Sequence, residues 1–321
     1  MITIFTGAGA SRALRYPTTG EFFTTGKGKQ LQQDNVYQNA LGYLQKNILD
    51  VEDILRLLYP FVALKGSPTG DFIYKHLSGH WLSNVPNFVT RTNSICFDHY
   101  GRVPTESEVK QLYMPVLDLC KWQKDSVSIF TTNYDPVTDV IMELAESNNI
   151  QSYDGFNRFG TWDSGGYSKV KSSGIGVYRL HGSMSWVEIN NGIRNTRDYS
   201  RREPGSVEHL IIYPGYKGNP EIEGHSAFRF AHTALRKELG ETSAVLIIGF
   251  SFRDPHLNDI FHEALTTNQK LRMVVWNPEW PEGSEVGLGE LKQEFEPRIS
   301  HLPHPFGDAK ALPVLKELLS I

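Results

Sequence analysis

Six short apolar runs constrain the fold of this chain more than any other feature. They are rich in Val, Ile and Phe, and in chain order they are ITIF (2–5), SVSIF (126–130), GIGVYRL (174–180), HLIIY (209–213), AVLIIGF (244–250) and LRMVVW (271–276). Most are continuously apolar, as strands are when helices cover both faces of a parallel sheet. Helical patterns lie between them. The sequence therefore predicts an α/β fold with a doubly wound, mainly parallel sheet.

The long stretch 17–124 interrupts this alternation, because it contains helical patterns broken by Gly and Pro and no strand-like run. Its helical segments are VYQNALGYLQKN, VEDILRLLYPFVALK, DFIYKHLSGHWL and EVKQLYMPVLDLCKWQ. We expect a single domain over residues 1–321, with a doubly wound core at 1–16 and 125–321 and a helical subdomain inserted at 17–124.

Composition excludes several classes of protein. No run approaches the roughly 18 apolar residues that span a bilayer, and the start MITIFTGAGAS does not resemble a secretory signal, so we expect a cytoplasmic protein without a membrane segment. The net charge is −4 and Lys and Arg are dispersed, so the sequence does not predict nucleic-acid binding. The only two cysteines, Cys96 and Cys120, provide neither a disulfide framework nor a metal cluster.

A glycine-rich turn follows the first strand in IFTGAGAS (4–11). Gly7 and Gly9 permit a tight turn and a close approach of backbone N–H groups to a pyrophosphate. The dehydrogenase fingerprint also needs a small residue at position 12 and an acidic residue about 20 residues further on. Position 12 is Arg, and GKGKQLQQ (26–33) has neither a preceding strand nor an acidic residue. Conventional hydride transfer is therefore disfavoured.

Polar residues follow two other predicted strands. TTNYD (131–135) places Asn133 and Asp135 at the carboxyl edge of the sheet, where open α/β sheets bind ligands. His181 lies in RLHGSMSW (179–186), directly after another strand. The alternatives are that Asn133 and Asp135 cap the following helix and that His181 is a satisfied core histidine.

Together these blocks resemble the sirtuin family. GAGAS (7–11), TTNYD (131–135), LHG (180–182), LIIGFS (246–251) and VVWN (274–277) have the order of the sirtuin motifs, each at a predicted strand end. LHGS followed by Trp and a G-x-S-x-x-D block resemble, more narrowly, the bacterial sirtuin-like branch. The resemblance covers residue 2 to about 280 outside the helical insert, and it implies a Rossmann-like core that binds NAD.

The resemblance also implies roles for individual residues. Asn133 and Asp135 would lie beside the nicotinamide ribose, and His181 would face the reacting ribose hydroxyls or a water. The cofactor-binding residues implied are Gly7, Ala8, Gly9, Ser11, Thr132, Gly249, Ser251 and Asn277. No metal ligand is implied. Residues 16–23 occupy the place of the flexible cofactor loop of sirtuins.

Three other residues have two interpretations each. Asp254 belongs to the GFSFRDPH block, but capping of the helix that begins at Pro255 explains it as well. Trp162 and Trp186 could wall a nicotinamide pocket or simply pack in the interior.

The prediction of the reaction depends on the zinc ribbon, a module that this chain lacks. Protein-deacylating sirtuins carry a zinc ribbon with two C-x-x-C pairs after the LHG block, whereas this chain has no cysteine after Cys120 and instead has the stretch 186–208, which we interpret as a polar loop. We therefore expect an NAD glycohydrolase that uses water as acceptor. Two alternatives stay open: an NAD-dependent protein deacylase or ADP-ribosyltransferase, and a non-catalytic NAD or ADP-ribose sensor.

Relatives in the bacterial branch deplete NAD in antiphage defence, which implies a regulated enzyme. No room for a sensor domain is expected in this chain. We therefore expect control by homo-oligomerisation or by a separately encoded activator such as an ATPase or a nuclease.

Overall fold

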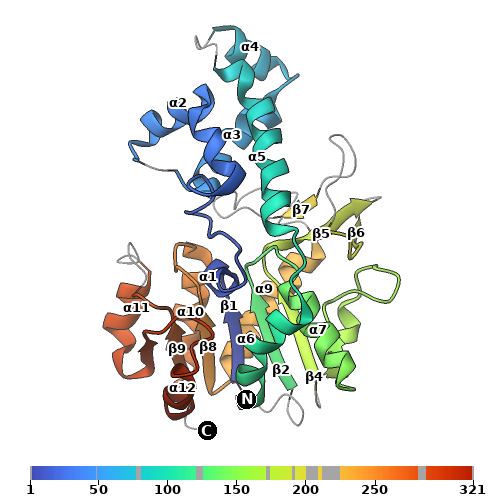
Figure 1. Ribbon diagram of the computed structural model, residues 1–321, viewed down its shortest axis with the longest axis vertical. Helices are drawn as coiled ribbons and strands as arrows, with labels where there is room; N and C mark the ends of the chain where they lie inside the picture. Colours follow the sequence, from blue (N-terminus) through green and yellow to red (C-terminus); the bar gives the residue numbers. More distant parts are fainter. Residues whose placement is uncertain are drawn as a thin grey trace.

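A seven-stranded sheet forms the centre of the molecule (Figure 1). The computed structural model describes residues 2–47, 49–76, 81–120, 126–170, 174–189, 192–199, 209–211, 225–280 and 287–319. The strand order is β10-β9-β8-β1-β2-β4-β3, and each neighbouring pair is parallel. The bounds are β1 (Ile2–Thr6), β2 (Ser126–Thr131), β3 (Ser152–Tyr153), β4 (Gly174–Arg179), β8 (Ala244–Ile248), β9 (Arg272–Trp276) and β10 (Ile299–Leu302). The predicted doubly wound parallel fold is confirmed.

Helices cover both faces of this sheet, which explains the continuously apolar strands. In β8, Leu246 and Ile248 pack into one core cluster, and Val245 and Ile247 pack into a second one on the opposite face. The first cluster includes residues of α6 (Glu106–Leu119), α7 (Val137–Ser147) and α12 (Ala311–Leu319). The second includes residues of α9 (Ser226–Glu241), α10 (Pro255–Thr267) and α11 (Leu288–Phe295).

One predicted strand belongs to a different sheet. Within HLIIY, β7 (His209–Ile211) pairs antiparallel with β5 (Gly182–Ile189), and residues 212–213 lie outside the described residues. β5 also pairs antiparallel with β6 (Gly192–Asn195), so the order of this sheet is β6-β5-β7. The interpretation of 186–208 as a polar loop is therefore wrong for its first part, which forms a hairpin; residues 190–191 and 200–208 are not described.

Helices connect β1 to β2. The short α1 (Ala8–Arg12) is followed by α2 (Asn35–Leu44), α3 (Val51–Leu64), α4 (Pro68–His76) and α5 (Val85–Tyr100), and these four stand beyond the carboxyl ends of the strands (Figure 1). None of the four predicted helical segments includes α5. α6 also lies between β1 and β2, but it packs on the sheet against α7 and α12.

Capping residues define where these helices begin. The Asp50 side chain accepts a hydrogen bond from the Glu52 N–H at the start of α3, and Asp34 caps α2 in the same way. Thr105 and Glu108 form a capping box at α6. Both cysteines are buried and free, as core residues are.

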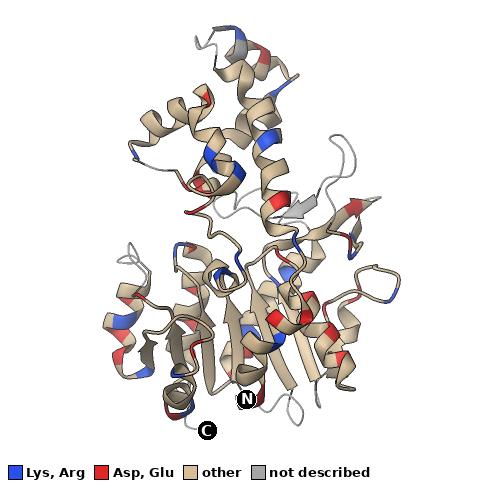
Figure 2. Ribbon diagram, viewed as in Figure 1, with Lys and Arg blue, Asp and Glu red and all other residues tan. Residues whose placement is uncertain are grey.

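Acidic and basic residues are dispersed along the described chain and do not gather in one element (Figure 2). Among the helices that the structure describes, none is long and apolar enough to cross a membrane.

Candidate functional site

A cleft of about 640 Å³ opens at the carboxyl ends of β1, β2, β4, β8 and β9. This volume lies in the range of small-molecule sites. Its walls come from the loops after these strands, from residues 16–20, and from Glu52 of α3 and Tyr100 of α5. Every predicted site residue except Gly7 lines it, namely Ala8, Gly9, Ser11, Thr132, Asn133, Asp135, His181, Gly249, Ser251 and Asn277.

The turns after β1 and β8 press against each other, and glycines make this contact possible. The Gly7 N–H donates to the Ile248 carbonyl at 2.9 Å, and the Gly9 N–H donates to the Gly249 carbonyl at 2.8 Å. Gly249 has φ +64°, and a Cβ there would lie 2.0 Å from the Ala10 nitrogen. The N–H groups of Gly7 and Gly9 therefore already have acceptors in the turn after β8. The close packing of the two turns explains glycine at these positions, in addition to the predicted approach of a pyrophosphate.

Ser11, Asn133 and Asp135 form one hydrogen-bonded unit on the floor of the cleft. The Asn133 Nδ2 donates to the Gly7 carbonyl and to the Ser11 Oγ, both at 3.0 Å, and the Ser11 hydroxyl donates to the Asp135 Oδ2 at 2.7 Å. Because the nitrogen of the carboxamide is used in this way, its oxygen is the atom that can accept a hydrogen bond from a ligand. The cleft residue Asn133 thus has a fixed orientation.

Asp135 is held on both carboxylate oxygens. Its Oδ1 accepts from the Val137 N–H at 3.0 Å, in addition to the bond from Ser11 to Oδ2. Burial raises the pKa of Asp135, while these hydrogen bonds oppose the shift. Its contacts are those of a residue that fixes the loop after β2.

An Asp135→Asn variant is expected to gain stability relative to the wild type as pH rises. The Asp135 carboxyl ionises near pH 4 in the unfolded chain, whereas in the folded protein it keeps its proton to higher pH. The free energy of unfolding of the wild type therefore falls as pH rises from about 4 through the raised pKa. The total loss is about 1.4 kcal/mol per unit of difference between the two pKa values. Urea unfolding of both proteins between pH 4 and 8 measures the difference. Asp259→Asn, at an exposed position of α10, controls for removal of a charge. A constant difference across this range would contradict the expectation.

His181 and Asp254 approach each other at the edge of the cleft. The His181 Nε2 lies 3.3 Å from the Asp254 Oδ2, and both side chains are at least 96% buried. Asp254 is also the N-cap of α10, because its Oδ1 accepts from the Leu257 N–H at 3.1 Å. The capping interpretation of Asp254 is confirmed, and the second oxygen of the same carboxylate faces the predicted catalytic histidine.

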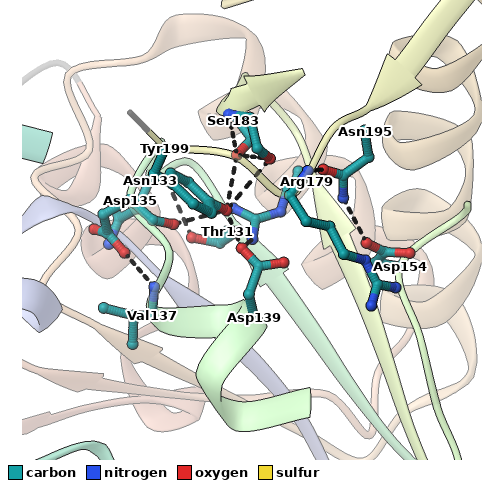
Figure 3. A network of polar contacts seen from close by, with 12 residues as sticks. Thr131, Asn133, Asp135, Val137, Asp139, Asp154, Arg179, Ser183, Asn195 and Tyr199 are labelled. Carbon is teal, nitrogen blue, oxygen red and sulfur yellow. Dashed lines mark hydrogen bonds and ion pairs between the residues drawn. The ribbon is translucent and has the colours of Figure 1, made fainter. Parts of the chain in front are cut away.

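A buried polar network supports the loop that carries Asn133 and Asp135 (Figure 3). The guanidinium of Arg179, at the end of β4, donates to the Asp135 carbonyl at 3.2 Å and to the Asp139 Oδ2 at 2.7 Å. Asp139 also accepts from the Tyr199 hydroxyl, which contacts Ser183 of β5. Burial alone would lower the pKa of Arg179, but Asp139 and other anionic groups raise it, so the group stays charged. The network fastens the loop after β2 to β4 and to the β5 hairpin.

Sequence reasoning missed part of the site. Glu52, Tyr100 and Arg253 line the cleft without having been predicted, and Asp254, for which capping is the alternative interpretation, lines it as well. Trp162 and Trp186 are not among the lining residues; both pack around Phe156 in a separate core cluster. The contribution of residues 16–20 agrees in position with the predicted cofactor loop.

A parallel sheet whose strand ends carry a glycine turn and polar loops around one cleft defines a Rossmann-like α/β domain. The family model described as SIR2-like domain matches residues 127–295, which is more than half of the chain. The chain belongs to this family.

Solved structures with a similar arrangement include complexes of Sir2 homologues. A mutant bound to ADP-ribose is 12% identical with a TM-score of 0.49, covering 100% of this chain and 93% of the other. A Sir2 homologue–NAD complex is 11% identical with a TM-score of 0.46, covering 99% and 90%. A mutant bound to 2′-O-acetyl-ADP-ribose is 11% identical with a TM-score of 0.47, covering 100% and 93%. A search of curated proteins finds no significant match to the chain.

Proposed function

We propose that this protein is an NAD-utilising enzyme that breaks the bond between nicotinamide and ribose, with water as the acceptor. The observation that carries the proposal is the convergence of Asn133 and His181 on one cleft, next to the paired glycine turns, in a chain of the SIR2-like domain family. A domain that only senses NAD has little need of a buried histidine–carboxylate pair in the same cleft as a fixed carboxamide.

The chemistry follows from the substrate. Nicotinamide leaves as a neutral molecule from a cationic ring, so the protein has to stabilise an oxocarbenium-like sugar and place a nucleophile. The carboxamide oxygen of Asn133 would accept a hydrogen bond from a ribose hydroxyl or the attacking water. His181 would accept the proton that this nucleophile loses, with the Asp254 carboxylate stabilising the imidazolium at 3.3 Å.

The group that accepts the ADP-ribosyl moiety distinguishes the proposed hydrolysis from a second candidate function, NAD-dependent deacylation or ADP-ribosyl transfer. The family match favours this candidate at least as well as hydrolysis, because transfer to an acyl group begins with the same loss of nicotinamide. Water is favoured by the absence of cysteine after Cys120, which leaves no two C-x-x-C pairs for the zinc ribbon of deacylating sirtuins.

One assay tests both candidates. The purified protein is incubated with NAD, with and without an acetyl-lysine peptide, and the products are separated by chromatography. Nicotinamide and ADP-ribose in equal amounts without peptide support hydrolysis. Acyl-ADP-ribose formed only with peptide, or labelled ADP-ribose on a protein, overturns hydrolysis in favour of transfer. Binding without turnover, also with neighbouring gene products added, would indicate a sensor.

Asp254→Asn is expected to lower kcat for NAD cleavage by about 10-fold to 100-fold, since an interaction with a charged group is worth about 1.5–3 kcal/mol. Asn is as good an N-cap as Asp, so α10 is preserved and only the negative charge beside His181 is removed. Steady-state kinetics should show the loss in kcat with little change in KM, together with an unchanged melting temperature. Equal activity of Asp254→Asn and the wild type would show that the carboxylate acts only as a cap.

We further propose that the enzyme acts in the bacterial cytoplasm as a regulated, NAD-depleting effector of antiphage defence. The sequence resemblance supports this role, as well as control by homo-oligomerisation or by a separately encoded ATPase or nuclease. Cellular NAD should fall during phage infection in cells that carry the wild-type gene, and it should not fall with Asn133→Ala.

A further inference from the structure

Among the described residues that line the cleft, the Asp, Glu, Lys and Arg side chains are all acidic except for a single guanidinium. Glu52, Asp135, Asp254 and Glu279 supply carboxylates, and Arg253 is the one Lys or Arg in this lining. Such a cleft suits a ligand with a cationic end, but a dinucleotide also carries a diphosphate with two negative charges. A diphosphate near four carboxylates needs a compensating cation.

Arg253 is fixed at the place where three segments of the chain meet. Its Nη1 lies 2.8 Å from the Asp50 Oδ2, its Nη2 donates to the Thr19 Oγ1 at 2.9 Å, and its Nε donates to the Ser251 Oγ at 3.3 Å. The same Asp50 oxygen accepts from the Thr19 hydroxyl at 2.9 Å, and the other caps α3. The guanidinium is thus oriented before any ligand arrives.

This orientation leaves capacity for a ligand. A guanidinium has five N–H donors, and the contacts above use one on each nitrogen, so each terminal nitrogen keeps a second N–H. Of the Arg253 side chain, 48% is exposed, although the Asp50 side chain beside it is only 7% exposed. Two terminal N–H groups of one guanidinium match the spacing of two phosphate oxygens.

We propose that Arg253 is the residue that binds the diphosphate of the dinucleotide, through the two terminal N–H groups that its contacts with Asp50, Thr19 and Ser251 leave available. The inference rests on the proposed function and specifies which part of the substrate Arg253 recognises. The opposing reading is a purely structural tether, in which Arg253 serves only to fasten α3 and residues 16–20 to the core.

Two substitutions distinguish diphosphate binding from a tether. Arg253→Gln removes the cation, whereas Asp50→Asn keeps the cap of α3 but removes the anion that competes with a phosphate for the guanidinium. Diphosphate binding predicts opposite effects of the two variants. A tether predicts that both weaken the site in the same way.

The experiment is calorimetric titration of the full-length protein with ADP-ribose and, as a ligand without phosphate, adenosine. For ADP-ribose we expect Arg253→Gln to raise the Kd about 10-fold to 100-fold, the value of a charge-assisted hydrogen bond. Adenosine binding should not change. Asp50→Asn should bind ADP-ribose at least as tightly as the wild type, and Arg253→Lys should be intermediate because it keeps the charge without the planar fork.

The failures are distinguishable. A wild-type protein that does not bind ADP-ribose overturns the proposed function together with this inference. Wild-type affinity for ADP-ribose in Arg253→Gln overturns the inference alone, as does a parallel loss of both ligands in Arg253→Gln and Asp50→Asn. Thermal melts establish that each variant is folded. If Arg253→Gln does not fold, Arg253→Lys takes its place. The inference is then overturned if Arg253→Lys binds ADP-ribose with a Kd no higher than that of Asp50→Asn.

Discussion

Replacing His181 with Ala is expected to lower kcat for NAD cleavage by about 10²–10⁴-fold, the usual contribution of a general base. His181 lies at the cleft with its Nε2 3.3 Å from a buried carboxylate, so the loss should appear in kcat, whereas the KM for NAD should change little. Steady-state kinetics on the purified variant, with nicotinamide release as the readout, give both constants.

Two further variants make this result specific. Asn133→Ala removes the fixed carboxamide and should cause a comparable loss, whereas His262→Ala, at an exposed position paired with Glu294, should retain wild-type kinetics. Full activity of His181→Ala with intact folding would mean that another group accepts the proton, and the proposed mechanism would have to be abandoned.

The second large effect is on stability. Arg179→Met is expected to cost about 3–5 kcal/mol in the free energy of unfolding, because it leaves Asp139 partly buried without its ion-pair partner and frees the Asp135 carbonyl. Urea unfolding followed by circular dichroism measures this loss. NAD cleavage should fall in the same variant, since the loop after β2 carries Asn133.

A double substitution separates charge pairing from packing. Asp139→Asn removes the anion, so Arg179→Met combined with Asp139→Asn should be more stable than the sum of the two single changes predicts. Strict additivity of the two losses would show that the pair contributes nothing beyond the volume of its side chains.

The parallel sheet was predictable from sequence because a strand covered on both faces has a distinct local pattern. The runs that form β1, β2, β4, β8 and β9 all have it. HLIIY has the same pattern but pairs with β5, and pairing depends on partners far away in the chain. β5 begins with GSMSW, where small and large residues alternate with the period of a strand. This stretch directly follows His181 and was interpreted as part of a site motif instead of a strand.

Sequence could bring most of the predicted residues to one cleft because each directly follows a strand, and the carboxyl ends of parallel strands share one edge. The lining residues that were not predicted do not follow this rule. Glu52 and Tyr100 belong to α3 and α5, and no local sequence pattern indicates that these helices lie next to the cleft. The Asp-Pro pair at Asp254 indicates a helix start, whereas its approach to His181 depends on how two distant strands are aligned.

The central position of β1 has a consequence for how this protein is made. β1 pairs with β2, more than 120 positions later in the chain, and with β8, more than 240 positions later. On a ribosome, the first strand therefore emerges long before either neighbour exists, and such distant pairing slows folding and prolongs exposure of apolar surface. The contact between Gly7 and the residue 248 carbonyl cannot form until most of the chain has been translated, so the cleft beside these two turns is completed late in synthesis.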